Sequence, residues 1–159
     1  MYIIVVSDTH GRLGNLRKVF ETEAKPDLVL HLGDVSHDEE EIRELAGCTV
    51  TFVRGNCDWF SREPDTRDFK LGKHRVHMEH GHNLPDSLQS ISYKADQLGA
   101  HIMLSGQTHR PMLTKLGDTI IANPGSISEP RQADGVPTYL VMEVDKEGEI
   151  KITPKQLHK

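Results

Sequence analysis

The sequence contains no long hydrophobic run, no large set of cysteines and no excess of positive charge. Its longest aliphatic stretch is Ile3–Val6, far short of the roughly 20 apolar residues that a membrane-spanning helix needs, and we expect no membrane association. Met1 and Tyr2 lead directly into this stretch without a basic segment, so we also expect no secretory signal. The two cysteines, Cys48 and Cys57, are too few for a disulfide framework and favour the reducing cytoplasm.

Basic residues are outnumbered as well. Lys and Arg number 19 against 24 Asp and Glu, and the net charge of −5 argues against binding to long nucleic acid, because such surfaces are normally basic. The 159 residues suit a single domain, residues 1–159, in which 36% apolar and 27% charged residues are ordinary globular proportions. These counts leave unexplained why the chain has ten histidines.

The first third of the chain alternates between two hydrophobic patterns. Continuous apolar runs predict buried strands at residues 1–7, 27–32 and 49–53. Apolar residues at helical spacing predict helices at residues 13–24 and 38–46. Strands and helices that alternate through short links indicate right-handed βαβ units on a parallel sheet.

The pattern changes to a loop and hairpins in the rest of the chain. We expect a loop at residues 56–67 and a helix at residues 88–98. Further strands are expected at residues 69–71, 75–78, 101–104, 112–116, 119–122, 139–144 and 149–153. About ten strands and three helices suit two packed sheets with helices outside.

Side chains that commonly bind metals lie just past the ends of predicted strands. These side chains are Asp8, His10, Asp34, Asn56, His80, His82, Gln107 and His109. Sites in open α/β sheets form outside the carboxyl ends of parallel strands, so we expect five separate segments to converge there. Glycines flank each cluster and permit tight turns that bring backbone close to a site.

Each of these residues also has an ordinary structural explanation. Asp8 could cap a helix, and Asp34 and Asn56 could occupy turns. The histidines could be exposed residues at hairpin exits or in loops. Such explanations require five coincidences at equivalent positions, and the joint pattern therefore favours a metal site.

The donor types select among metals and indicate a reaction. Carboxylates, an amide oxygen and imidazoles favour Mn²⁺, Fe²⁺, Ni²⁺, Co²⁺ or Zn²⁺ over Ca²⁺. The set is too large for one tetrahedral ion and suits two ions that share a carboxylate. Two ions about 3.5–4 Å apart would convert a bound water to hydroxide, which attacks phosphorus in line with the leaving group.

Six short motifs follow one another along the chain. They are Ser7-Asp8-Thr9-His10-Gly11, Leu32-Gly33-Asp34, Arg54-Gly55-Asn56-Cys57-Asp58, Glu79-His80-Gly81-His82, Ser105-Gly106-Gln107-Thr108-His109 and Asn123-Pro124-Gly125-Ser126. In these motifs the sequence resembles the calcineurin-like metallophosphoesterases, specifically their small bacterial and archaeal phosphodiesterase branch. The resemblance runs from Ile3 to about Tyr139, and the motifs are specific in combination rather than singly.

The resemblance implies a fold, a cofactor and a ligand set. The fold is of the α/β class, a four-layer α/β/β/α sandwich of two mixed sheets flanked by helices. The cofactor is a pair of divalent ions, Mn²⁺ first, with Ni²⁺, Fe²⁺, Co²⁺, Zn²⁺ or Mg²⁺ as substitutes. By resemblance, one ion is held by Asp8, His10 and His109, the other by Asn56 and His80, and Asp34 bridges the two.

Two positions depart from the motifs of the larger family. Its last motif normally has a histidine that binds the second metal where this chain has Gln107, and an amide is a poorer donor than imidazole for Co²⁺, Ni²⁺ or Zn²⁺. We therefore expect a second site that is weaker or more tolerant of Mn²⁺ and Mg²⁺. Cys57 replaces a histidine thought to protonate the leaving group, a feature shared by the small branch. Substrates with good leaving groups should then be preferred, with His82 as a substitute acid or substrate contact.

The remaining residues of interest receive simpler interpretations. We expect a packed, inert thiol at Cys57 and a phosphate contact from Arg131. His31 and His101 are expected inside strands. Surface or hairpin positions are expected for His37, His74, His77 and His158.

These patterns predict a cytoplasmic metal-dependent phosphodiesterase acting on small phosphodiesters, with Asp34, Asn56 and His82 as its catalytic residues. The alternative is a non-catalytic interaction scaffold with a weakened metal site, because a eukaryotic retromer subunit shares the fold and acts as a scaffold. The intact donor set favours catalysis. Edge strands of the two sheets would also allow copies of the chain to pair.

Overall fold

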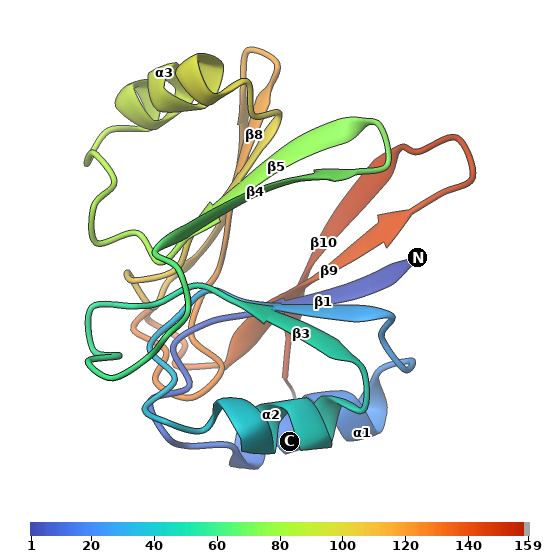
Figure 1. The fold of residues 1–159 in the computed structure, drawn as a ribbon, viewed down its shortest axis with the longest axis vertical. Helices are drawn as coiled ribbons and strands as arrows, with labels where there is room; N and C mark the ends of the chain where they lie inside the picture. The colour runs from blue at the N-terminus through green and yellow to red at the C-terminus, as the bar shows by residue number, and fades with distance from the viewer. Residues whose placement is uncertain (158–159) are drawn as a thin grey trace.

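Three helices and ten strands make up the computed structural model, which describes residues 1–157 (Figure 1). The strands form two sheets of five. The first sheet, in the order β10-β9-β1-β2-β3, contains β1 (Tyr2–Val6), β2 (Leu28–His31), β3 (Thr49–Phe52), β9 (Thr138–Val144) and β10 (Ile150–Gln156). The second sheet, in the order β4-β5-β6-β8-β7, contains β4 (Thr66–Leu71), β5 (His74–Glu79), β6 (Ile102–Leu104), β7 (Pro111–Leu116) and β8 (Thr119–Pro124).

Helices cover the outer faces of the two sheets. In Figure 1, α1 (Gly14–Thr22) and α2 (Glu39–Ala46) lie beneath the first sheet, and α3 (Leu88–Leu98) lies above the second. Three hydrophobic clusters fill the space between each sheet and its helices and the space between the sheets. The predicted four-layer α/β/β/α sandwich of two mixed sheets is confirmed.

β1 contributes to two of these hydrophobic layers at once. Ile4 and Val6 belong to the cluster that faces the helices, whereas Ile3 and Val5 belong to the cluster between the sheets. Side chains alternate between the faces of a strand, so a strand buried on both faces needs a continuous apolar run. This is why the pattern at the start of the sequence is unbroken.

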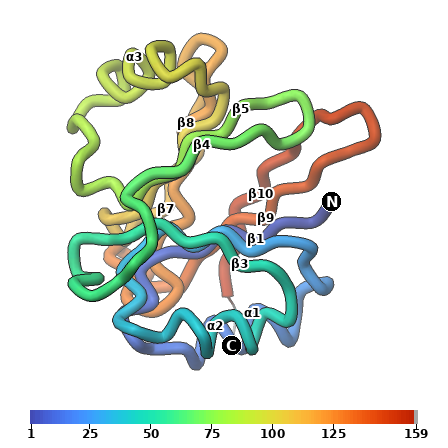
Figure 2. The backbone as a smooth tube through the Cα atoms, viewed as in Figure 1, coloured from blue at the N-terminus to red at the C-terminus, as the bar shows by residue number. Residues whose placement is uncertain are grey.

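Strand directions place several carboxyl ends at one end of the sandwich. β1, β2 and β3 are parallel, and β5, β6 and β8 are parallel in the second sheet. β9 pairs antiparallel with β1, so a late segment of the chain lies beside the first strand (Figure 2). Loops that leave β1, β3 and β5 gather at the left of Figure 1.

α2 and α3 begin and end close to where their sequences indicate, whereas α1 ends at Thr22, two residues earlier than predicted. α2 carries three glutamates in its first turn and ends at Gly47, whose φ of 64° suits glycine. α3 is capped by Ser87, whose side chain accepts a hydrogen bond from the Ser90 N–H at 3.1 Å. Within residues 1–157, no helix is both long enough and apolar enough to cross a membrane.

β4 begins earlier than predicted. Its first residue is Thr66 rather than Phe69, and the register pairs Thr66 with Glu79 of β5. β4 is an edge strand that is mostly polar, so its first three residues lack the apolar pattern by which strands are recognised. The loop between β3 and β4 accordingly ends at Asp65 rather than at residue 67.

His77 lies in the β4–β5 hairpin as predicted but is not at the surface, and the prediction for His101 was wrong. His77 is only 2% exposed, because its ring lies between two acidic side chains rather than in water. His101 is exposed and lies just before β6, where its Nδ1 accepts a hydrogen bond from the backbone N–H of Arg75 at 2.9 Å. His31 is fully buried in β2 as expected, and His158 falls outside the described residues.

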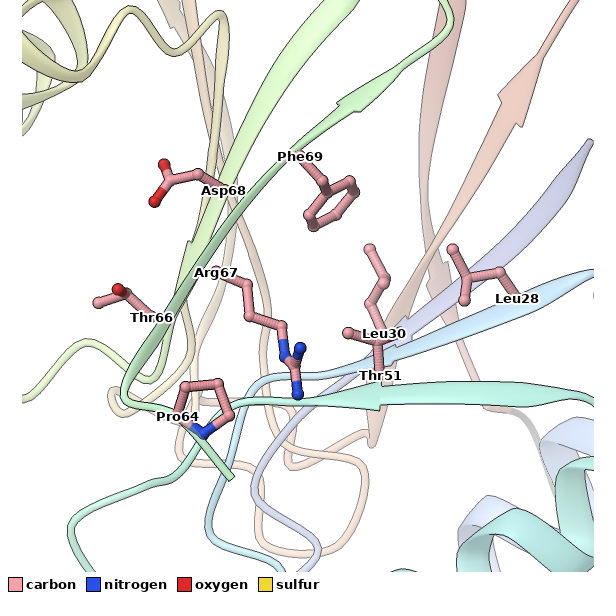
Figure 3. Close-up of a pocket in the computed structure, with 8 residues that line it drawn as sticks. All are labelled: Leu28, Leu30, Thr51, Pro64, Thr66, Arg67, Asp68 and Phe69. Atoms are coloured by element: carbon pink, nitrogen blue, oxygen red, sulfur yellow. The ribbon is translucent and has the colours of Figure 1, made fainter. Parts of the chain in front are cut away.

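A pocket of about 360 Å³ opens between β4 and the edge of the first sheet (Figure 3). Leu28, Leu30 and Phe69 form its apolar part. Arg67 reaches across from β4 and donates a hydrogen bond from Nε to the carbonyl oxygen of Phe52 at 2.7 Å. Because the predicted site residues are not among its lining, this pocket lies apart from the candidate site.

Candidate metal centre

Loops from both sheets deliver predicted ligands to one place. Asp8 and His10 follow β1, and Asp34 follows β2. His80 follows β5, and His109 comes from the loop after β6. The donor atoms of these residues fall into groups whose members lie within 4.8 Å of one another.

Asp8 is fully buried at the centre of the cluster. Its Oδ2 accepts a hydrogen bond from Ser7 Oγ at 2.6 Å, whereas its Oδ1 has no hydrogen-bond partner. Three imidazole Nε2 atoms face that Oδ1, at 3.3 Å for His109, 3.6 Å for His10 and 3.7 Å for His80. Burying a carboxylate oxygen without a partner is costly, so this arrangement suits a bound cation.

Asp34 faces two of the same histidines. Its Oδ2 lies 3.1 Å from the Nε2 of His80 and 3.5 Å from the Nε2 of His10. Its Oδ1 accepts a hydrogen bond from the Cys57 N–H at 3.0 Å. One oxygen is thus fixed by the backbone while the other lies between two imidazoles.

Backbone carbonyls fix the tautomers of two histidines. The Nδ1 of His80 lies 2.7 Å from the Leu32 oxygen, and the Nδ1 of His109 lies 2.7 Å from the Glu129 oxygen. A carbonyl only accepts hydrogen bonds, so each Nδ1 carries the proton and the Nε2 of a neutral ring holds a lone pair. Metal-binding histidines use this arrangement.

Opposite charges shift the pKa values of the cluster. Burial raises the pKa of Asp8, but the nearby imidazoles of His10 and His109 outweigh burial and hold it well below its usual range. Burial also raises the pKa of Asp34, but the nearby imidazole of His80 outweighs burial, so the net pKa of Asp34 is lowered. The nearby carboxylate of Asp8 raises the pKa of His10. Burial lowers the pKa of His80, but the nearby carboxylate of Asp34 outweighs burial, so the net pKa of His80 is raised. Both carboxylates are therefore ionised and attract a cation.

The backbone of the site is strained. Seven non-glycine residues in the described part of the chain have positive φ, and five of them are predicted site residues. The five are Asp8, His10, Asp34, Gln107 and His109, with φ between 47° and 72°. Such conformations are uncommon outside glycine and concentrate at functional sites.

Two glycines allow backbone to approach the carboxylates. A Cβ on Gly55 would overlap Oδ1 of Asp34, and a Cβ on Gly106 would overlap Oγ of Ser7 and lie 2.9 Å from Oδ2 of Asp8. Any other residue at either position would push a carboxylate out of place. Gly55 and Gly106 therefore each have a specific spatial role.

Asp58 supports the site, and sequence reasoning missed this role. It is 4% exposed, and its carboxylate accepts hydrogen bonds from the N–H groups of Asp34, Val35, Ser36 and Gly55 at 2.7–3.1 Å. It thus joins the loop after β2 to the loop after β3. Its only signal was its place in the third motif, because an aspartate in a loop is usually a turn residue.

Asn56 and Gln107 lie beside the cluster. Asn56 is exposed and directly precedes Cys57. The backbone N–H of Cys57 donates a hydrogen bond to Asp34. Gln107 donates its N–H to Oδ2 of Asp8 at 3.3 Å, and its side-chain Oε1 is buried without a hydrogen-bond partner. Their roles as ligands stay predictions.

His82 and Arg131 are exposed near the predicted ligands. The ring centroid of His82 lies 5.7 Å from that of His80. The backbone N–H of Arg131 donates to the carbonyl oxygen of His109 at 3.0 Å. Their catalytic and substrate-binding roles likewise stay predictions.

Among the described residues, three groups of donors could hold a cation. They are Asp8 with His10 and His109, Asp8 with Asp34 and His80, and His10 with Asp34 and Cys57. Cys57 is exposed, so the prediction of a packed thiol was wrong. Its N–H binds Asp34, which holds the residue at the surface of the loop next to the cluster.

The chain matches the calcineurin-like phosphoesterase superfamily domain over residues 1–147. It belongs to that family. A probable metallophosphoesterase of Methanothermobacter thermautotrophicus is 35% identical over 155 residues, which cover 92% of this chain and 88% of that protein. The phosphodiesterase YfcE of Escherichia coli is 27% identical over 157 residues, covering 82% of each chain.

A solved structure has the same fold. Wild-type Vps29 of Entamoeba histolytica, complexed with Zn²⁺, superimposes with a TM-score of 0.79 over 98% of this chain and 99% of that one. The two sequences are only 20% identical, so this likeness shows the fold alone.

Proposed function

We propose that the chain is a metal-dependent phosphodiesterase that hydrolyses small phosphodiesters at a site for two divalent cations. The observation that carries this proposal is the buried, unpartnered Oδ1 of Asp8, which three imidazole nitrogens face at 3.3–3.7 Å. Family membership and a relative named as a phosphodiesterase support the class of reaction.

The residues of this chain fit such cations. Buried carboxylate oxygens and Nε2 atoms with fixed tautomers are ligands for divalent ions of the first transition series, and Mn²⁺ is our first choice. Ni²⁺, Fe²⁺, Co²⁺, Zn²⁺ and Mg²⁺ would be substitutes. The buried, unpartnered Oε1 of Gln107 is a further oxygen donor, on a residue whose N–H bonds Asp8.

Two sets of side chains would hold the cations, with Asp34 between them. The first set is Asp8, His10 and His109, and the second is Asn56, His80 and Gln107. Oδ1 of Asp8 also faces His80 at 3.7 Å, so Asp8 can support both sets.

The reaction follows from this arrangement. When bound, the cations would lower the pKa of a water and neutralise charge on the phosphoryl oxygens for in-line attack on phosphorus. Asp34 keeps its place because the Cys57 N–H fixes one of its oxygens. Asn56 would orient the phosphoryl group from the loop after β3. His82, exposed beside His80, would donate a proton to the leaving oxygen, and Arg131 would contact the phosphate.

The test combines metal content with turnover. The purified chain is stripped with a chelator and reloaded with Mn²⁺, and bound metal and hydrolysis of bis(p-nitrophenyl) phosphate are measured. We expect about two ions per chain and a loss of activity of roughly 100-fold or more in Asp34→Asn. His74→Gln serves as the control, because His74 lies in the β4–β5 hairpin and bonds Glu149. A reloaded protein that binds no metal and turns over no diester would refute the proposal.

No specific observation favours the alternative of a scaffold. The Vps29 structure shares the fold at 20% identity and carries no argument on activity. Five predicted donor residues have a strained backbone, and Oδ1 of Asp8 is buried without a hydrogen-bond partner. A scaffold would need neither feature. The single domain of residues 1–159, the cytoplasmic location and pairing between copies of the chain stay predictions.

A further inference from the structure

Two aromatic side chains stand exposed in the loop between β3 and β4. Trp59 and Phe60 are each 82% exposed, more than any other large hydrophobic residue in the described chain. The loop follows β3 and projects at the left of Figure 1. Adjacent exposed aromatic rings are uncommon on a protein surface and mark places where something binds.

The exposed indole lies next to the proposed metal centre. Trp59 lines a hollow of about 330 Å³ together with Asn56, Arg54, Asp65 and His82. Its volume falls within the roughly 300–1,000 Å³ that ligand pockets occupy. Asn56 and His82 are residues of the proposed active site, so one substrate can place a group against Trp59 and its phosphate on the metals.

The loop that presents Trp59 is held in place. Its ends are joined by a hydrogen bond from the Arg54 N–H to the Pro64 oxygen at 2.8 Å. Asp58, directly before Trp59, is fixed by its four backbone contacts. The ring of Phe60 stacks on His37, with centroids 5.7 Å apart and planes 29° apart. Trp59 is thus presented from a fixed base, which lowers the cost of ordering it on binding.

We propose that Trp59 is a stacking platform for the nucleobase of a nucleoside phosphodiester whose phosphate lies on the metal centre. This inference rests on the proposed phosphodiesterase function and names its class of substrate. An indole face stacks on any base, and this contact typically contributes a substantial part of binding to single nucleotides.

The rim of the hollow favours a nucleobase over a simple hydrocarbon ring. Arg54 and Asp65, which line the hollow, form an ion pair at 2.8 Å, and the exposed imidazole of His82 is also part of the lining. These groups can donate and accept hydrogen bonds, which match the polar edge of a base. The net charge of −5 favours a short nucleotide rather than a long strand.

The chain offers a direct probe, because Trp59 is its only tryptophan. AMP and ribose 5-phosphate are titrated into the Mn²⁺-loaded full chain while tryptophan fluorescence is recorded. The two ligands share the sugar phosphate and differ only by the base. We expect AMP to quench the fluorescence and to bind about 5- to 100-fold more tightly than ribose 5-phosphate.

Variants assign the effect to the indole. Both ligands are used as inhibitors of bis(p-nitrophenyl) phosphate hydrolysis, and the ratio of their inhibition constants is compared. The ratio should fall to near one in Trp59→Ala and be largely kept in Trp59→Phe. Tyr93→Ala, which removes a 64% exposed ring on α3, should leave it unchanged.

The outcomes separate this inference from the proposed function. Equal binding of AMP and ribose 5-phosphate by an active enzyme would overturn the nucleobase platform and leave the phosphodiesterase intact. A ratio unchanged in Trp59→Ala would overturn it as well. Quenching by AMP in a protein without turnover would overturn the phosphodiesterase and keep the base-binding site.

Discussion

Asp34 and Asp58 are buried aspartates whose carboxylates face different partners. Asp58 accepts four backbone hydrogen bonds, so its charge is satisfied within the protein. Oδ2 of Asp34 instead faces His10 and His80. The first arrangement stabilises a loop, and the second attracts a cation. This difference in partners separates a positioning residue from a proposed ligand.

The Asp58→Ala substitution tests the positioning role. It would leave four N–H groups without their acceptor, and we expect a loss of about 2–4 kcal/mol in the free energy of unfolding, measured in urea. Metal affinity should fall as well, because Asp34 and Gly55 lose their anchor. Asp118→Ala, in the exposed β7–β8 turn, is the control. Unchanged metal affinity in Asp58→Ala would show that Asp58 does not position Asp34.

Gln107→His tests the weakness of the proposed second metal site. The buried Oε1 of Gln107 has no hydrogen-bond partner, and an imidazole nitrogen there would be a better donor for Ni²⁺, Co²⁺ or Zn²⁺. We expect the second equivalent of Zn²⁺ to bind at least about 10-fold more tightly in the variant, as measured by calorimetry. Equal second-site affinity in the two proteins would refute the role of Gln107.

At the residue scale, the sequence predicts donors better than it predicts their support. Asp8, His10, Asp34, His80 and His109 could be predicted because each follows a buried strand, and the structure brings them together. The anchoring of Asp58 depends on backbone N–H groups from two loops, which no local pattern encodes. The exposure of Cys57 likewise depends on where the tertiary fold places its loop rather than on a local pattern.

At the scale of elements, most strands and helices could be predicted from hydrophobic period and turn residues. Examples are the continuous apolar sequence of β1 and the glycines that end two helices, Gly47 after α2 and Gly99 after α3. β4 shows the limit, because an edge strand with polar residues gains its structure from pairing with β5 rather than from its own pattern. The burial of His77 on β5 was missed for the same reason.

His77 links β4 and β5 through an acidic pair. Its Nδ1 lies 2.8 Å from Asp68 and its Nε2 2.6 Å from Glu79, which also bonds Lys94 at 2.9 Å. Only an imidazolium donates to both carboxylates. Burial lowers the pKa of His77, but these hydrogen bonds outweigh burial and the net pKa is raised. Burial raises the pKa of Glu79, but its hydrogen bonds with His77 and Lys94 outweigh burial, so the net pKa of Glu79 is lowered.

These shifts predict how this link depends on pH. A raised histidine pKa gives stability that is complete below the unfolded value of about 6.5 and is lost as pH rises through the folded value. We expect His77→Gln to lower the free energy of unfolding by about 1–3 kcal/mol near pH 6 and by less near pH 9. Urea unfolding at both pH values measures this difference, with His74→Gln as control. If His77→Gln lowered the free energy of unfolding by the same amount at both pH values, His77 would be neutral in the folded protein.

At the scale of the whole molecule, the candidate centre lies across the two sheets. Asp8 and Asp34 come from the first sheet, whereas His80 and His109 come from the second. The fold class could be predicted because alternating strands and helices leave few topologies. The hollow beside Trp59 could not, because it is formed by the loops after β3 and β5, whose conformations depend on tertiary contacts.

A cation that bridges the sheets should stabilise the fold. Binding only to the folded state at 100 times the dissociation constant adds about 2.7 kcal/mol, which for a chain of this size raises the melting temperature by roughly 5–10 °C. We expect Mn²⁺ to give this rise in the stripped wild-type protein, as followed by circular dichroism. Asp8→Asn should abolish the rise, because it removes the anionic oxygen that three imidazoles face. Asp145→Asn, in the β9–β10 turn, should keep it. An equal rise in Asp8→Asn would show that Mn²⁺ stabilises the fold from somewhere other than the centre between the sheets.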